Sequence, residues 1–317
     1  MTGGRSPVDD TVPATETSRR VCLFALLAAL VPTLVSQTGC AGQRSMADLV
    51  LLFPQHKKED RTGLIRRTIE VSTGPVEVWV AQSPGAQEAG GPQAFVLLYS
   101  GNANLVEPVV KWVAGGIWKH RPVEVWGMNY PGYGGSAGRA KLSEIPEAAL
   151  AAYDALAAHA GGKPIFLDGA SMGGAVSLFV AARRPVAGIA LLNPPPLREV
   201  VATHAWWNFG VLTKKVAAQV PDELDAIANA RQCRVPLFAV VAERDEIVPA
   251  RLQQAIYDNY AGPITLYRMK GATHGSHVNA EGQQRRQEWT DVVWRDVVER
   301  YAARAPGEPK QAGATGE

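Results

Sequence analysis

Three side chains far apart in the sequence could together perform nucleophilic catalysis: Ser171, Asp245 and His274. A serine hydroxyl is a poor nucleophile at neutral pH unless a neighbouring base accepts its proton. His274 could accept that proton, while Asp245 fixes the tautomer of the imidazole and stabilises the imidazolium that forms. These residue types therefore predict a catalytic triad, provided that the fold brings the three side chains together.

The segment around Ser171 has the pattern of a sharp turn between a strand and a helix. Residues 169–174 read Gly-Ala-Ser-Met-Gly-Gly, with an apolar run before them and a helix-compatible run after them. A Gly-x-Ser-x-Gly turn in this context is typical of a nucleophile elbow, which holds the serine hydroxyl in a cleft on a strained backbone. Because the following helix points its N-terminus at the same place, we expect the Met172 N–H to face a developing oxyanion.

Asp245 and His274 each follow a predicted strand. The apolar run 236–242 precedes Asp245, and the run 264–269 precedes His274. The carboxyl ends of parallel strands meet at one edge of a sheet, where ligands bind in open α/β folds. The sequence thus predicts that both side chains reach the edge that carries Ser171.

Other polar residues nearby have alternative interpretations. His277 competes with His274 but lies three residues further from the strand, and Glu243 could replace Asp245 although it is expected to point back along its strand. Asp168 is interpreted as a structural or pocket-wall carboxylate. Cys233, the one thiol expected in the folded body, is interpreted as a small buried hydrophobic residue, so no disulfide framework is expected.

The elements that must position the triad follow from hydrophobic patterning. Runs 64–72 and 76–82 predict a hairpin turning at 73–75, with the second strand half-exposed and alternating. After it, strands alternate with helices, which favours an α/β fold with a mostly parallel central sheet and helices on both faces. The strands are expected at 94–99, 122–128, 164–167, 187–192, 236–242 and 264–269, and the helices at about 105–115, 144–160, 175–182, 250–258 and 283–303. One side of the last helix is expected to carry Trp289, Val292, Val293, Val297 and Tyr301.

Two further motifs carry a family resemblance. Residues 100–104 read Ser-Gly-Asn-Ala-Asn after the third strand, and residues 129–136 read Asn-Tyr-Pro-Gly-Tyr-Gly-Gly-Ser after the fourth. With the chain order Ser, Asp, His, residues 60–303 resemble the α/β-hydrolases, in particular a branch with His-Gly-Asn-Ala and Tyr-x-Gly-Tyr-Gly-x-Ser at these places. The resemblance implies that the backbone N–H of Asn102 joins that of Met172 in an oxyanion hole. In that branch the His before Gly-Asn-Ala supports the loops around the site. Here Ser100 stands in its place.

The resemblance also implies a small cap insertion at about 193–233, over the triad. Its aromatic cluster includes Trp206 and Trp207. These rings could form an apolar wall for a substrate or could fill the cap's own small core, and both interpretations stay open. Tyr133 is a further candidate for the wall of the cleft.

The N-terminus has the pattern of an export signal. Arg19 and Arg20 precede an apolar run at 21–35, which is short for a membrane span but suited to a signal peptide, and small residues precede Cys40 as in a bacterial lipobox. We expect residues 1–40 to be the signal, 41–304 the α/β-hydrolase domain and 305–317 a disordered tail. The expected location is the bacterial cell envelope, with the catalytic domain in the periplasm or outside and a lipid anchor at Cys40. A plain secretory signal, a twin-arginine signal and a short membrane anchor are the alternatives.

Composition excludes several function classes. The formal net charge of +2, without a basic stripe, gives no reason to expect a nucleic-acid partner. The histidines are scattered and no Cys-x-x-Cys is present, so no metal is expected, and no Gly-x-Gly-x-x-Gly follows a first strand, so no dinucleotide cofactor is expected.

Together these features predict a serine hydrolase that cleaves an ester, thioester or related acyl bond through a Ser171 acyl-enzyme. Its substrate would be a small-molecule or lipid-like acyl compound, and its membrane contact would be through the N-terminal anchor only. Two alternatives remain: a non-catalytic envelope binding protein with this fold, and a proline-type serine aminopeptidase. Against the peptidase, the cap has no acidic cluster dedicated to a free amine.

Overall fold

The computed structural model describes residues 43–204 and 210–301. The predicted signal, Cys40, Trp206, Trp207 and the tail from residue 305 lie outside the described residues. The strands are β1 (Ile65–Val71), β2 (Gly74–Gln82), β3 (Ala94–Tyr99), β4 (Val123–Met128), β5 (Ile165–Ala170), β6 (Gly188–Leu192), β7 (Leu237–Ala242) and β8 (Ile264–Met269). The helices are α2 (Met46–Leu51), α3 (Pro84–Glu88), α4 (Val106–Trp112), α5 (Ile145–Ala160), α6 (Met172–Ala181), α7 (Leu197–His204), α9 (Thr213–Ala217), α10 (Ala226–Ala230), α11 (Ala250–Asp258) and α12 (Ala280–Val293).

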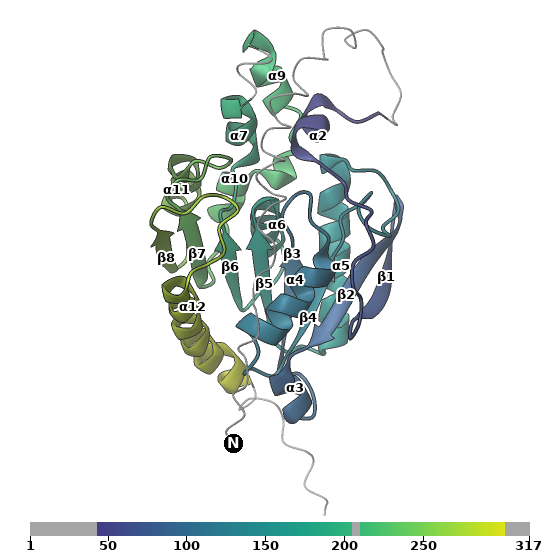
Figure 1. The fold of residues 1–317 in the computed structure, drawn as a ribbon, viewed down its shortest axis with the longest axis vertical. Helices are drawn as coiled ribbons and strands as arrows, with labels where there is room; N and C mark the ends of the chain where they lie inside the picture. Colours follow the sequence, from purple (N-terminus) through teal and green to yellow (C-terminus); the bar gives the residue numbers. More distant parts are fainter. Residues whose placement is uncertain (1–42, 205–209, 302–317) are drawn as a thin grey trace, which may run out of the picture. The chain divides into compact units, whose positions relative to one another are not determined.

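All eight strands form one sheet in the order β1-β2-β4-β3-β5-β6-β7-β8 (Figure 1). The pairs β1–β2 and β2–β4 are antiparallel, and every other pair is parallel. This confirms the predicted hairpin, whose strands pair from Ile65 opposite Val80 to Val71 opposite Gly74. It also confirms the α/β class with a mostly parallel sheet.

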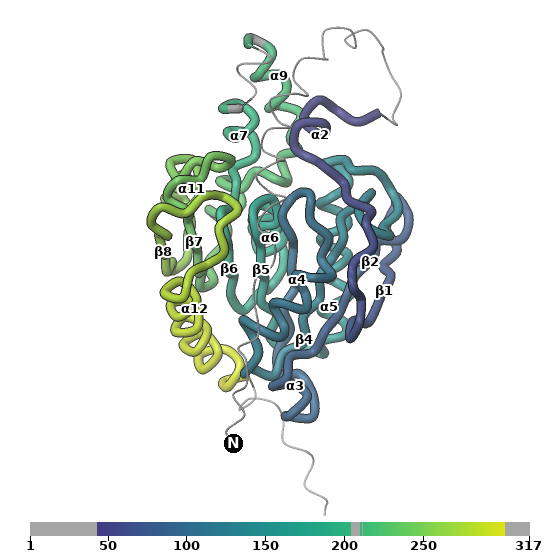
Figure 2. Tube along the Cα trace, viewed as in Figure 1, coloured from purple at the N-terminus to yellow at the C-terminus, as the bar shows by residue number. Residues whose placement is uncertain are grey.

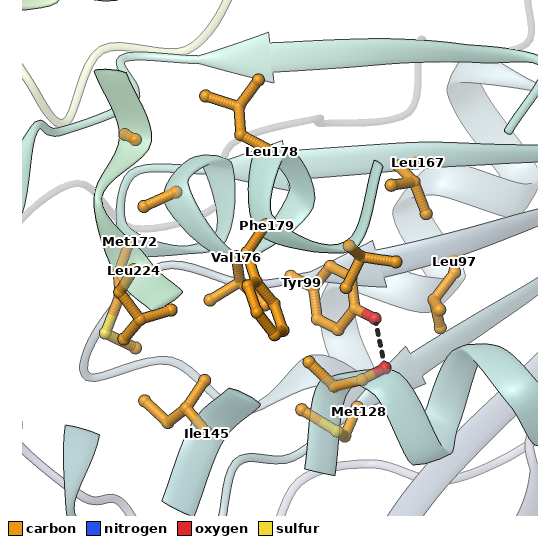
Figure 3. Close-up of a cluster of buried hydrophobic side chains, with 14 of the residues drawn as sticks. Leu97, Tyr99, Met128, Ile145, Leu167, Met172, Val176, Leu178, Phe179 and Leu224 are labelled. Carbon is orange, nitrogen blue, oxygen red and sulfur yellow. Dashed lines mark hydrogen bonds between the residues drawn. The ribbon is translucent and has the colours of Figure 1, made fainter. Parts of the chain in front are cut away.

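Helices cover both faces of the sheet because successive strand residues point to opposite sides. Along β3, Leu97 and Tyr99 belong to the core beneath α5 and α6, whereas Val96 and Leu98 belong to the core beneath α4 and α12. Figure 3 shows the first core, where the Tyr99 ring lies beside Phe179 of α6. The Tyr99 hydroxyl donates to the Ala149 carbonyl of α5 at 2.8 Å, so the one polar atom of this ring is paired.

The expectation of a half-exposed β2 is wrong. Residues Val76–Val80 are all buried, including Glu77 at 2% exposure and Trp79 at 4%. β2 lies inside the sheet between β1 and β4, and the face that carries Trp79 packs in the core with α4, with two arginines beside it. The Arg66 Nε is 2.8 Å from Glu77 Oε1, and the Arg61 guanidinium lies 4.7 Å from the centre of the Trp79 ring. Long arginine stems can cover apolar surface while their charged heads stay near water.

The predicted apolar side of the last helix is confirmed in part. Trp289 and Val293 are buried and Val297 packs against the same core, but Val292 is 49% exposed and Tyr301 is 36% exposed, and Trp294 and Val298 are buried as well. A π-helical segment, η6 (Trp294–Glu299), follows α12 and carries Trp294 and Val298. A π-helix has i→i+5 bonding, so each of its turns takes an extra residue and shifts the buried stripe relative to a regular 3.6-residue period.

Between β6 and β7 the described chain forms several short helices, α7, α9 and α10, where the cap was predicted. The C-terminal part of this segment packs against α6. Arg183 donates to Asn229 Oδ1 at 2.9 Å, and the Cys233 thiol lies 3.6 Å from the Leu178 carbonyl oxygen. Residues 226–233 therefore belong to the layer of helices over the sheet.

Candidate active site

Ser171 occupies a sharp turn between β5 and α6, as its sequence context predicts. Its backbone has φ 49° and ψ −125°, a strained conformation for a residue other than glycine. A Cβ added at Gly173 would lie 1.9 Å from the Tyr99 carbonyl oxygen, and one at Gly169 would lie 2.5 Å from the Gly173 carbonyl oxygen. The Ser171 N–H donates to the Leu192 carbonyl at 2.7 Å. The turn closes only because two positions lack side chains.

The structure brings Ser171, His274 and Asp245 together. His274 Nε2 is 3.0 Å from Ser171 Oγ, and His274 Nδ1 is 2.8 Å from Asp245 Oδ2. The His274 side chain is 15% exposed, whereas that of Asp245 is fully buried. This geometry lets the imidazole accept the serine proton at one nitrogen while the carboxylate holds the proton on the other.

The Asp245 carboxylate is held by the turn that follows β7 and by α11. Its Oδ1 accepts the N–H groups of Ile247 at 3.0 Å and Val248 at 2.7 Å. Its Oδ2 accepts a further bond from the side-chain amide of Gln253 at 3.2 Å. Burial of a charge is costly unless hydrogen bonds compensate it, and these three donors do so while leaving Oδ2 directed at His274.

Asn193 is a site residue that sequence reasoning missed. It follows β6 with φ 48°, a left-handed conformation that asparagine tolerates. Its side-chain oxygen accepts the Ala242 N–H at 2.8 Å, and its amide nitrogen is 3.4 Å from the His274 carbonyl oxygen. Asn193 thus ties the end of β7 to the loop that carries His274. An asparagine directly after a predicted strand at the same edge was the available signal.

The two predicted oxyanion donors belong to segments that adjoin Ser171. Met172 begins α6, and a Cβ built on Gly101, the residue before Asn102, would lie 3.4 Å from the Ser171 Cβ. Within residues 43–204 and 210–301, neither the Met172 N–H nor the Asn102 N–H donates to a protein acceptor. Unpaired N–H groups next to the nucleophile are what a developing oxyanion requires.

Tyr133 does not line the cleft. The side chain is 0% exposed, and its hydroxyl donates to Asn102 Oδ1 at 2.8 Å. The prediction of a pocket residue is wrong here because the glycine-rich turn folds inward, so Tyr133 packs behind the 100–104 loop and edge-on against Tyr130.

The competing polar residues have structural partners. Asp168 forms an ion pair with Arg286 at 2.6 Å, in agreement with the structural interpretation. Glu243 Oε2 accepts the Gly271 N–H at 2.8 Å, and so shapes the loop before His274 instead of replacing Asp245. His277 is exposed.

Cys233 is a free, buried cysteine, as predicted. Burial raises the pKa of its thiol to about 12, so the nucleophilic thiolate is scarce at neutral pH. In the part of the chain that the structure describes, no group of three His, Cys, Asp or Glu side chains could hold a metal ion. Among the same residues, no helix combines the length and apolar character needed to span a membrane.

Comparison with known proteins gives a weak sequence match and strong structural ones. No family model matches the chain. The uncharacterised protein Rv2307c of Mycobacterium tuberculosis strain H37Rv is 28% identical over 159 residues, as is its counterpart MT2364 in strain CDC 1551. The match covers 49% of this chain and 54% of each relative, so it spans about half the length of those proteins.

Solved structures match over most of the chain. The Pyrococcus furiosus esterase Pf2001 superposes with a TM-score of 0.60 at 15% identity, covering 81% of this chain and 99% of that one. An α/β-hydrolase from Vibrio vulnificus gives 0.56 at 15% identity, covering 74% and 82%. An α/β serine hydrolase homologue from Coxiella burnetii gives 0.51 at 18% identity, covering 76% and 99%. Together with the sheet order and the turn at Ser171, these matches show that the chain has the α/β-hydrolase fold.

Proposed function

We propose that this protein is a serine hydrolase that cleaves an ester, thioester or related acyl bond. The observation that carries the proposal is the continuous hydrogen-bonded chain from Ser171 Oγ through the His274 imidazole to the buried Asp245 carboxylate. The solved structures of similar fold include one described as an esterase and one described as a serine hydrolase homologue, which agrees with this chemistry.

The geometry supports a two-step acyl transfer. Ser171 Oγ attacks the carbonyl carbon of the substrate while His274 Nε2 accepts the hydroxyl proton, and the carbonyl oxygen becomes an oxyanion. The N–H groups of Met172 and Asn102 donate to that oxyanion; one such donor is worth about 2.7–4 kcal/mol of barrier in a well-studied serine protease. The tetrahedral intermediate collapses to the acyl-enzyme as His274 returns the proton to the leaving group.

Hydrolysis of the acyl-enzyme repeats these steps with water as the nucleophile. His274 removes a proton from the water, the same two donors hold the second oxyanion, and Ser171 recovers its proton as the acid product leaves. Asp245 stays ionised throughout and stabilises the imidazolium in each half-reaction. The predicted substrate class, a small-molecule or lipid-like acyl compound, remains part of this proposal.

A fluorophosphonate probe tests the proposal on the purified full chain. We expect the probe to label the wild type and Ser72→Ala, which changes an exposed serine far along the sequence. Ser171→Ala should abolish labelling and lower ester turnover by at least about 10³-fold, because no other nucleophile replaces the hydroxyl. Labelling that survives in Ser171→Ala would reject the assignment. An unlabelled wild type that turns over no ester would favour a binding protein, and a preference for aminoacyl over acyl chromogenic substrates would favour the aminopeptidase.

We also propose export to the cell envelope with a lipid anchor at Cys40, as the N-terminal pattern predicts. Metabolic labelling with a radioactive fatty acid in a bacterial host tests it. The label should be incorporated into the wild type and Cys22→Ser and be absent from Cys40→Ser. Label retained in Cys40→Ser would contradict an anchor at Cys40, and a wild type without label would leave a plain secretory signal, a twin-arginine signal or a short membrane anchor.

A further inference from the structure

We propose that the 129–133 segment positions the oxyanion loop, residues 100–104, and that the Tyr133 hydroxyl is its principal positioning group. This inference rests on the proposed function, since it concerns the alignment of the Asn102 N–H. Three side chains of the segment reach the loop or the helix that follows it. They are Asn129, Tyr130 and Tyr133, each at most 1% exposed.

The closest of these contacts is made at Asn102 itself. Its side-chain oxygen accepts the Tyr133 hydroxyl at 2.8 Å and the backbone N–H groups of Phe53 and Ala103, both at 2.9 Å. Figure 2 shows the segment that carries Phe53 running from α2 to β1. With its side chain held from both sides, Asn102 cannot rotate its backbone freely, so the direction of its N–H is set by these bonds.

The backbone next to Asn102 needs such support. Ala103 has φ 62°, a left-handed conformation in a residue other than glycine. Strained backbone of this kind persists only where surrounding contacts over-determine it. The bond that the Ala103 N–H donates to Asn102 Oδ1 is one such contact, and the Tyr133 hydroxyl stabilises the same acceptor.

The other two side chains hold the loop at its ends. The Tyr130 hydroxyl donates to the Ser100 carbonyl at 2.9 Å, and Asn129 Oδ1 accepts the Val106 N–H, at the start of α4, at 3.0 Å. The Ser100 side chain gives no comparable support, because its hydroxyl is buried without a partner among the described residues. Thus the side chain that stands where the resemblance expects a loop-supporting His makes no hydrogen bond to the described residues, and the 129–133 segment takes that role.

A buried network fixes the supporting segment in turn. The Asn129 amide nitrogen donates to Glu77 Oε2 at 2.9 Å and to Glu107 Oε2 at 3.1 Å. Each carboxylate also binds an arginine, Arg66 for Glu77 at 2.8 Å and Arg61 for Glu107 at 3.1 Å. Because both carboxylates can only accept, they oblige the Asn129 amide to point its nitrogen at them and its oxygen at Val106.

Loss of the Tyr133 hydroxyl should therefore disturb the transition state more than the bound substrate. The Asn102 N–H gains its strongest interaction when the carbonyl oxygen becomes an oxyanion, so a misaligned donor lowers kcat and leaves KM nearly unchanged. Complete removal of an oxyanion donor costs about 10²–10³-fold in kcat. We expect Tyr133→Phe to lower kcat about tenfold, since the donor is displaced and not deleted.

Tyr260→Phe is the matched control. Tyr260 is buried and its hydroxyl donates to a backbone carbonyl, that of Val235, also at 2.8 Å, but none of its described hydrogen bonds involves the oxyanion loop. Each variant loses the hydrogen bond that a buried tyrosyl hydroxyl donates, so both should lower the melting temperature by about 2–4 °C. Only Tyr133→Phe should lower kcat, measured per active site by titration with the fluorophosphonate probe.

A double-mutant cycle tests whether Tyr133 acts through Asn102. In an Asn102→Ala background, which removes the acceptor, Tyr133→Phe should cost less than twofold further in kcat. Equal kcat losses in the Tyr133 and Tyr260 variants, or a tenfold loss that persists in the Asn102→Ala background, would overturn the positioning role. Activity that survives in Ser171→Ala would instead overturn the proposed function, so the two failures are distinguishable.

Discussion

The two sides of the candidate active site are held in different ways. On the side of the nucleophile, the turn between β5 and α6 depends on backbone fit, because side chains at Gly169 and Gly173 would overlap neighbouring backbone atoms. On the side of the oxyanion loop, the backbone has more room, and side-chain hydrogen bonds from Asn129, Tyr130 and Tyr133 hold it. One side is shaped by steric exclusion and the other by directional polar contacts.

This difference predicts different responses to substitution. A clash between an added side-chain carbon and the neighbouring backbone cannot be relieved without moving a strand or a helix. Substitutions of the glycines at the nucleophile turn should therefore affect folding. A lost hydrogen bond leaves the chain folded but less well aligned, so changes behind the oxyanion loop should affect catalysis before stability. Three predictions address this contrast, beginning with the largest effect.

Gly173→Ala should prevent normal folding. The added methyl group would lie 1.9 Å from the Tyr99 carbonyl oxygen and 2.8 Å from the Ser100 carbonyl oxygen. To make room for it, β3 and α6 would have to move apart. We expect a loss of about 4 kcal/mol or more in the free energy of unfolding, measured by urea denaturation, or a failure to obtain soluble protein.

Two other glycines serve as controls for that change. Gly115→Ala, with no atom within 4 Å of the new Cβ, should be neutral or slightly stabilising. Gly101→Ala, on the oxyanion side, meets its nearest atoms at 3.4 Å and should stay within about 1 kcal/mol of the wild type. If Gly101→Ala were as damaging as Gly173→Ala, the oxyanion side would also depend on backbone fit and the contrast would be wrong.

At acidic pH, protonation of the Glu77 carboxylate should weaken the hydrogen bonds that hold the 129–133 segment. Burial raises the pKa of Glu77, but the Gly135 N–H, the Asn129 amide and Arg66 outweigh it, so the pKa is lowered overall. A carboxyl whose pKa is lower when folded stabilises the fold above its unfolded pKa, near 4.5, and this contribution is lost as the pH falls through the folded pKa. Glu77→Gln should lower the free energy of unfolding at pH 7 by about 2 kcal/mol, typical of hydrogen bonds to a charged group.

Comparing the free energy of unfolding of the wild type and Glu77→Gln at several pH values separates the contribution of the Glu77 carboxylate. Urea denaturation at pH 7, 5 and 3.5 should show the wild type losing more stability on acidification than Glu77→Gln, so that the two curves converge at low pH. Glu147→Gln is a suitable control, since Glu147 also has a lowered pKa but bonds to the exposed Ser72, away from the oxyanion loop. A constant difference between wild type and Glu77→Gln at all three pH values would contradict the prediction.

The sequence predicts the strands and the triad correctly where local apolar patterns and chain order determine them. The strand at 94–99 matches β3 residue for residue, because a continuous apolar run bounded by turn residues is typical of a strand buried on both faces. The chain order of Ser171, Asp245 and His274 and their places after β5, β7 and β8 sufficed to predict that they meet, since parallel strands end at one edge.

Sequence reasoning failed where the outcome depends on side-chain direction. Tyr133 has the same sequence context whether its ring faces a cleft or the loop behind it, and that context reports neither its packing against Tyr130 nor its bond to Asn102. The burial of β2 depends on α4 and on arginines from β1 and from the segment before it, and the exposure of Val292 and Tyr301 in the last helix depends on packing that the apolar pattern does not report. Asn193 follows a predicted strand, but its contacts with the end of β7 and with the His274 loop depend on segments far away in the sequence.

Ser100 provides the smallest and sharpest test of the contrast. Ser100 is 2% exposed and is the first residue of the oxyanion loop. Its hydroxyl has no hydrogen-bond partner among the described residues. A buried hydroxyl without a partner destabilises the fold, so its removal should not cost stability. Ser100→Ala should therefore be neutral or more stable by up to about 1 kcal/mol, with kcat and KM within twofold of the wild type.

The result bears directly on what holds the loop. If Tyr130 and Tyr133 hold it, the Ser100 side chain is dispensable, and only its carbonyl, which accepts the Tyr130 hydroxyl, matters. A fall of tenfold in kcat for Ser100→Ala, with the melting temperature unchanged, would show that the hydroxyl finds a partner during turnover. The support of the oxyanion loop would then be shared with its first residue, and the role assigned to the 129–133 segment would have to be reduced accordingly.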